Sequence, residues 1–244
     1  MRPIAQYHRP ADIDEAVNLL NRPGVNSVVV AGGTGLTAAE LPADTEVVDI
    51  QTAVPSGLEV DGEHLVMGAM TTLQDMVDSN LAPELIRDLA KREASSTFRH
   101  AVTVGGIVGA ADWESGLLAG LLVHQAQLTI ATPDGTRSMP LEDALAAPHT
   151  GTMITSVSIA VSGEGAFAAT GRTPADTPIV AAAGRVVAGG FRIALTGVAT
   201  TPILVDPDDL TSLDPPGDFR GSPEYRRSLA ATLTGRVITR LGGA

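Results

Sequence analysis

Two glycine pairs, each placed directly after an apolar β-branched stretch, constrain this chain more than any other feature. Gly32-Gly33 follows the valine run of residues 28–30, and Gly105-Gly106 follows the Val-Thr-Val of residues 102–104. Glycine permits positive φ and lets another group approach the backbone closely. Consecutive N–H groups in such a turn can form a concave anion site. Either pair alone is typical of a tight turn after a strand, whereas the two together favour a nucleotide held by its phosphates.

The composition excludes several classes of partner. The net charge is −12 and no basic block is present, so we expect no nucleic-acid partner. Cysteine is absent, which excludes a disulfide, an iron–sulfur cluster and a thiolate zinc site within the chain, and no histidine pair has ligand spacing. There is neither an apolar run long enough to span a membrane nor an apolar leader, so we expect a cytoplasmic protein with no membrane span.

The hydrophobic pattern predicts three units. A helix over residues 13–20 with continuous apolar strands over 27–31 and 46–50 indicates a small α/β unit over residues 1–53. The Asp61-Gly62 and Asp134-Gly135 turns predict two hairpins in a second unit over 54–161. Its other predicted elements are helices over 72–79, 83–92, 117–123 and 141–145 and a strand over 153–161.

The last predicted unit follows a small polar linker over residues 162–165. We expect strands over 166–170, 179–187 and 191–198 and a closing helix over 223–241, which together make a small α+β domain over 166–244. We expect Arg226 and Arg227 to cap or decorate that helix.

Six segments, in this order along the chain, resemble a known family. They are residues 1–16, 29–36, 47–50, 65–73, 98–106 and 220–227. The chain is similar to the FAD-binding medium subunit of molybdenum hydroxylases, of the carbon monoxide dehydrogenase and xanthine dehydrogenase type. The resemblance implies an α+β fold: a PCMH or vanillyl-alcohol-oxidase-like FAD-binding domain of two α/β subdomains (1–53 and 54–161), followed by a C-terminal domain (166–244) with a three-stranded sheet and a helix.

The resemblance also implies a function. FAD would lie between the two subdomains and receive electrons from an iron–sulfur small subunit, which receives them from a molybdopterin large subunit. An external acceptor would then take them, and the complex would be a dimer of heterotrimers. This chain would not touch the organic substrate.

The cofactor-binding residues follow from the same resemblance. Backbone N–H groups of residues 32–36 and 103–106 would supply most contacts to the pyrophosphate. Trp113 could stack on a flat ring, although a lone tryptophan is more typical of a core or an interface. The implied residues are Ala31, Gly32, Gly33, Thr34, Gly35, Leu36, Thr103, Gly105, Gly106, Ile107, Ala110 and Gly116.

Three of these positions depart from the family pattern and leave alternatives open. Ile107 stands where the family has asparagine, and Ala110 and Gly116 stand where it has threonine or asparagine and aspartate. Three lost hydrogen bonds of about 1 kcal/mol each would weaken FAD binding roughly a hundredfold. The alternative is a flavin-free structural or interaction subunit, which Asp112 and Glu114 favour because they would repel a diphosphate. A binder of another nucleotide is a third reading.

Overall fold

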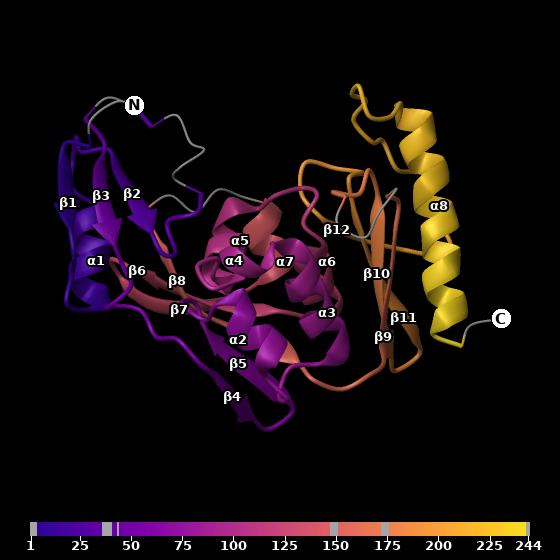
Figure 1. Ribbon diagram of the computed structural model, residues 1–244, viewed down its shortest axis with the longest axis horizontal. Helices are drawn as coiled ribbons and strands as arrows, with labels where there is room; N and C mark the ends of the chain where they lie inside the picture. The colour runs from indigo at the N-terminus through magenta and orange to yellow at the C-terminus, as the bar shows by residue number, and fades with distance from the viewer. Residues whose placement is uncertain (1–3, 36–40, 43, 147–150, 172–175, 243–244) are drawn as a thin grey trace.

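Three β-sheets follow one another along the molecule in the computed structural model, which describes residues 4–35, 41–42, 44–146, 151–171 and 176–242. The first sheet lies at one end, the second sheet and its helices occupy the middle, and the third sheet lies at the other end (Figure 1). Within these residues, no helix is both long and apolar enough to cross a membrane.

The first sheet is parallel and has the order β1-β3-β2. Strands β2 (Ser27–Val30) and β3 (Glu46–Asp49) and helix α1 (Ile13–Leu20) match the sequence prediction to within one residue. Asp12 caps α1 by accepting a hydrogen bond from the Glu15 N–H at 2.8 Å. Strand β1 (Gln6–His8) was not predicted, because its three residues are polar or aromatic and largely exposed.

The second sheet is antiparallel, with the order β4-β5-β8-β6-β7. Both predicted hairpins are confirmed, and Gly62 and Gly135 have φ of 59° and 115°. At such angles a residue with a Cβ would be strained. The strands are β4 (Leu58–Asp61), β5 (His64–Gly68), β6 (Gln127–Thr132), β7 (Gly135–Pro140) and β8 (Met153–Ala160).

Six helices accompany this sheet in the described chain, and their core is continuous with the third sheet. They are α2 (Leu73–Asp78), α3 (Glu84–Glu93), α4 (Ser96–Arg99), α5 (Val104–Ala110), α6 (Gly116–Val123) and α7 (Leu141–Ala146). Helix α6 is apolar on every side because it lies between α3 and the third sheet, and seven of its eight residues are buried. Ala183 and Ala194 of the third sheet belong to the same core cluster.

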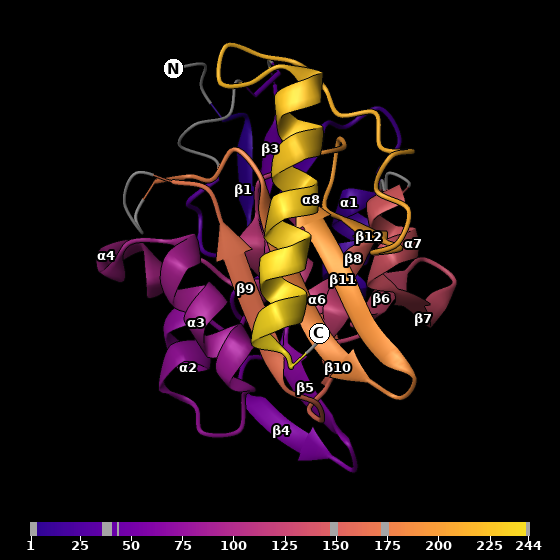
Figure 2. The ribbon, with the colours of Figure 1, turned by 90° about the vertical axis from the view of Figure 1, so that its right-hand side faces the viewer.

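The third sheet has four strands, so the prediction of three strands was wrong. Its order is β12-β11-β10-β9, and α8 (Pro223–Arg240) covers the face turned away from α6 (Figure 2). The added strand is β12 (Ile203–Val205), three residues between Pro202 and Asp206. A pattern this short carries no periodicity, so only pairing with β11 defines it as a strand. The other strands are β9 (Gly165–Ala169), β10 (Ala181–Val187) and β11 (Gly190–Thr196).

Arg226 does not decorate α8 as predicted, since it is the largest fully buried side chain of the protein's described part. Its guanidinium donates to the carbonyl oxygens of Ile179 (2.7 Å) and Gly197 (2.9 Å) and to the Asp218 carboxylate (2.7 Å). It also lies 4.9 Å from the centroid of the Trp113 ring, within cation–π distance. Arg226 therefore joins α8 to two strand ends, a loop and the segment that precedes α6.

His124 ends α6 in a fully buried position and gives a pH-dependent prediction. Its Nδ1 donates to the Ala160 carbonyl at 2.7 Å, and burial lowers its pKa from 6.5 to about 4. Between these values the unfolded chain binds a proton that the folded protein does not. The free energy of unfolding should therefore fall as the pH drops from 6.5 to 4, by up to about 1.4 kcal/mol per pH unit from this residue.

The variant His124→Asn tests this, because asparagine keeps an amide donor for Ala160 and does not titrate. Urea unfolding at several pH values between 7 and 4 should show a flatter pH dependence in the variant than in the wild type. Identical slopes in the two proteins would contradict the assignment.

Candidate functional site

The two glycine pairs lie in different kinds of structure. Gly32-Gly33 follows the carboxyl end of β2 in an irregular loop, as predicted. Gly105-Gly106 is instead the first turn of α5, whose N-cap Thr103 accepts a hydrogen bond from the Gly106 N–H at 3.1 Å. Glycine's low helix propensity concealed this helix in the sequence, because two glycines in four residues resemble a turn.

The glycines bring backbone segments into direct contact. A Cβ on Gly32 would lie 1.5 Å from the Ala101 carbonyl oxygen, so this glycine allows the two loops to touch. A Cβ on Gly105 would lie 2.8 Å from the Ala69 carbonyl oxygen, which seats α5 against the end of β5. Gly33 has φ of 74° and needs glycine for its conformation. Contact and backbone conformation thus both account for the glycine pairs.

A groove of about 920 Å³ opens between these two segments. Strand β2, the second sheet and α7 also line it, the last two with side chains such as Leu128, Ile130, Leu145 and Met153. None of the described residues that line it is charged, and its side-chain hydroxyls belong to Thr34, Thr103 and Thr152. Its size and apolar lining are typical of small-molecule and cofactor sites.

Hydrogen-bond donors are distributed unevenly between the two segments. Val104 and Gly105 N–H groups donate to the Thr71 and Ala69 carbonyls at 2.9 Å each, and the Gly106 N–H donates to its own cap. These three N–H groups are therefore already engaged within the chain, which leaves fewer donors for a pyrophosphate on this side of the groove than the sequence suggested. In the first loop, no acceptor among the described residues faces the N–H of Gly32, Gly33 or Gly35.

The structure brings most of the predicted site residues to one groove. Gly116 is an exception: it begins α6, where a Cβ would lie 3.3 Å from the Phe167 ring and 3.5 Å from Leu89, in the core. Leu36 lies outside the described residues. Those that line the groove are Ala31, Gly32, Gly33, Thr34, Gly35, Thr103, Gly105, Gly106, Ile107 and Ala110.

The apolar wall was missed by sequence reasoning. Leu128, Ile130 and Met153 belong to β6 and β8, and Ala69 follows β5. Each residue looks like an ordinary core position in its own strand. The alternating pattern along β8 identifies which of its residues share one face of the sheet. It does not show which of these residues lie beneath a glycine loop and so line the groove.

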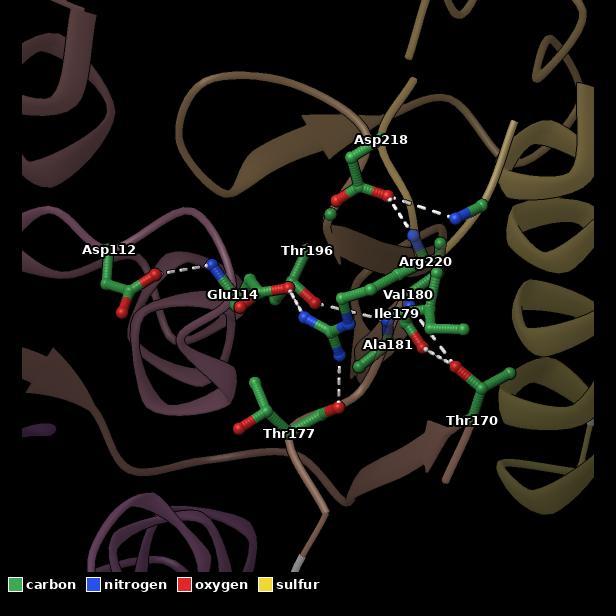
Figure 3. A network of polar contacts seen from close by, with 12 residues as sticks. Asp112, Glu114, Thr170, Thr177, Ile179, Val180, Ala181, Thr196, Asp218 and Arg220 are labelled. Carbon is green, nitrogen blue, oxygen red and sulfur yellow. Dashed lines mark hydrogen bonds and ion pairs between the residues drawn. The ribbon is translucent and has the colours of Figure 1, made fainter. Parts of the chain in front are cut away.

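The acidic residues after α5 do not line the groove. Glu114 forms an ion pair with Arg220, which also donates to the Thr177 carbonyl (Figure 3). Asp112 accepts a hydrogen bond from the Glu114 N–H at 2.9 Å. The Glu114 charge is thus paired and neither carboxylate lines the groove, which leaves the Asp112 charge as the remaining basis for the predicted repulsion of a diphosphate. Trp113 packs against Arg226 and does not line the groove.

Known proteins similar to this chain share its fold over nearly its whole length. The family described as "FAD binding domain in molybdopterin dehydrogenase" matches residues 3–161. YgfM of Escherichia coli (strain K12) is 28% identical over 94% of this chain and 93% of its own length. The carbon monoxide dehydrogenase medium chain of Afipia carboxidovorans is 28% identical over 96% of this chain and 95% of its own length. One chain in the structure of reconstituted CO dehydrogenase from Oligotropha carboxidovorans is 26% identical to this chain. The two superpose with a TM-score of 0.87, and the alignment covers 100% of each chain.

Proposed function

Since the chain belongs to the family of FAD-binding domains of molybdopterin dehydrogenases, we propose that it holds FAD in the groove between Gly32-Gly33 and α5. The observation that carries the proposal is the first glycine loop, whose N–H groups at Gly32, Gly33 and Gly35 face no acceptor among the described residues. Successive N–H groups of this kind bind a pyrophosphate without any charged side chain.

The groove fits the rest of the cofactor as well. Its apolar strand side chains suit the flat faces of a ring system, and they exclude water from it. Bound FAD would supply two-electron and one-electron redox chemistry, while this chain supplies binding and orientation. Ile107 and Ala110 line the groove without hydrogen-bonding groups on their side chains, so backbone N–H groups, threonine hydroxyls and apolar contact would provide the affinity.

We further propose that the chain relays electrons within a larger complex. Its relatives include medium chains of carbon monoxide dehydrogenase, and the medium-chain fold extends over the whole of this chain. Partners would be an iron–sulfur small subunit and a molybdopterin large subunit in a dimer of heterotrimers, in the cytoplasm. Purification from the native source should recover all three chains together, and recovery of this chain alone would contradict the relay.

A flavin-free structural subunit is the second candidate function. The occupied N–H groups of Val104, Gly105 and Gly106 favour it, because they remove donors from one side of the groove.

The first measurement is the visible spectrum of the purified native protein, followed by release of any chromophore. Flavin absorbance with one FAD released per chain supports the first candidate. A protein that stays colourless after incubation with excess FAD establishes the second.

A substitution in α5 should separate cofactor binding from folding. Gly109 lines the groove, its φ is not positive, and a Cβ there meets nothing within 4 Å. Gly109→Leu should leave the free energy of unfolding unchanged or raise it by up to about 1 kcal/mol, because glycine is a poor helix former. The new side chain should occupy the groove and weaken FAD binding at least about tenfold, which corresponds to 1.4 kcal/mol.

Gly235→Leu is the matched control, since Gly235 lies within α8, also has nothing within 4 Å of a Cβ and does not line the groove. The FAD affinity is measured by titration with flavin fluorescence as the signal, and the free energy of unfolding is measured by urea denaturation. Equal FAD affinity in the two variants would show that the cofactor does not lie beside Gly109.

A further inference from the structure

A second groove, separate from the first, lies where the third sheet meets the end of α6. It has a volume of about 810 Å³ and shares no lining residue with the glycine-loop groove. Its polar side chains include Gln125, Ser162, Arg185 and Arg192, and apolar side chains such as Val187, Phe191 and Leu204 form the rest of its wall. In Figure 1 the β10–β11 strands that carry both arginines lie beside α6.

The two arginines are direct cross-strand partners. Arg185 on β10 pairs with Arg192 on β11, so their side chains leave the same face of the sheet from neighbouring positions. Like charges placed opposite each other destabilise a sheet unless something compensates them. In a protein with a net charge of −12, such a pair is a local concentration of positive charge.

Arg185 has no carboxylate partner among the described residues. The residue is only 4% exposed, and its Nη2 donates to the Gln125 Oε1 at 2.8 Å while its Nη1 lies 3.5 Å from the Ala160 carbonyl. Its Nε is buried and has no hydrogen-bond partner in the described structure. A buried guanidinium without a counter-charge is costly, so an anion that reached Arg185 would stabilise the folded protein.

Among the described residues, carboxylates lie near the groove but none forms an ion pair with Arg185, whereas Arg192 has one. Arg192 donates through Nε to the Leu122 carbonyl at 3.2 Å, at the carboxyl end of α6, and its nearest carboxylate is the exposed Glu142 at 3.8 Å. Asp206 also lines the groove and accepts a hydrogen bond from the Asp208 N–H at 3.0 Å. Burial, and then the charge of Arg192, lower the pKa of Arg185, consistent with the lack of a carboxylate partner for Arg185.

We propose that Arg185 and Arg192 form a binding site for the oxyanion group, phosphate or carboxylate, of a small organic molecule. Guanidinium groups present paired N–H donors in a fork that matches the oxygens of either anion. Val187, Phe191 and Leu204 offer apolar surface beside this charge for the body of the ligand. The proposal does not depend on FAD, because the two grooves have separate walls.

Anion titrations of the full chain test the proposal, with FAD held at one equivalent per chain so that no excess organic phosphate competes for the second groove. Sodium phosphate and sodium succinate are compared with sodium chloride at equal ionic strength, and the unfolding temperature is the readout. We expect a saturable rise with phosphate, succinate or both, and the more effective anion identifies the ligand's head group. A response no larger than that of chloride overturns the proposal.

Three variants locate the response. Arg192→Gln should raise the apparent dissociation constant of the anion at least about tenfold, as expected for a charge-assisted hydrogen bond. Arg236→Gln removes a charge from the exposed side of α8 and should leave the constant unchanged. Arg192→Lys keeps the charge and a donor near Leu122, so it should fold and retain part of the response. Equal constants in wild type and Arg192→Gln overturn the proposal, as does complete loss in Arg236→Gln.

Discussion

Replacing Gly32 by alanine should abolish FAD retention. The new Cβ would lie 1.5 Å from the Ala101 carbonyl oxygen, a backbone atom that no side-chain rotation can move away. The loop that carries Gly32 must therefore separate from the segment before α5, and the N–H groups of the first loop lose their arrangement around the groove. Losing two or three charge-assisted hydrogen bonds corresponds to roughly a thousandfold or greater loss of affinity.

Gly35→Ala provides the matched control in the same loop. A Cβ on Gly35 meets nothing within 4 Å and its φ is not positive, so this variant should keep its FAD. The FAD content per purified chain and the affinity of the apoprotein for added FAD measure both variants. If Gly32→Ala retains the cofactor as well as Gly35→Ala does, the contact between the loops does not organise the site.

Arg226→Ala should be the most destabilising single substitution outside the groove. The side chain is fully buried, and its removal leaves the Asp218 carboxylate and the carbonyls of Ile179 and Gly197 without their donor. Truncating a large, fully buried side chain and leaving two carbonyls without their donor costs about 3–5 kcal/mol. For a chain of this length, that loss corresponds to a decrease in the unfolding temperature on the order of 10 °C.

The control for this variant is Arg236→Ala, an exposed position on the same helix. Its effect should be within about 0.5 kcal/mol, as for most surface substitutions. Urea unfolding of both variants gives the free energies directly. A loss at Arg226 no larger than at Arg236 would show that the buried network does not hold the C-terminal sheet and α8 together.

Local sequence signals predicted most of the elements. Helix α1 carries its own cap and apolar face, and the Asp61-Gly62 turn carries its own hairpin, so neither needs distant residues to be recognised. Elements without such signals were missed or misread. Strands β1 and β12 have three residues each, and α5 begins with glycines that resemble a turn.

The candidate site shows the same division. The sequence indicated the glycine pairs, because close approach of two backbone segments requires glycine at particular positions. It also indicated the family, because six matching segments in the same order are specific for that family. It did not indicate that Gly116 packs against Phe167, nor that Glu114 is paired with Arg220, which lies 106 residues away. Such pairings depend on which distant segments meet.

The sequence by itself determined the fold class, the order of most elements and the two backbone segments that form the groove. Each of these depends on residues within a few positions of one another, through periodicity, capping or glycine's missing side chain. Only the tertiary structure decided which N–H groups lack an acceptor, which arginines are buried and which two arginines face each other. Burial and hydrogen-bond satisfaction are properties of neighbours in space, and no stretch of the chain contains its own spatial neighbours.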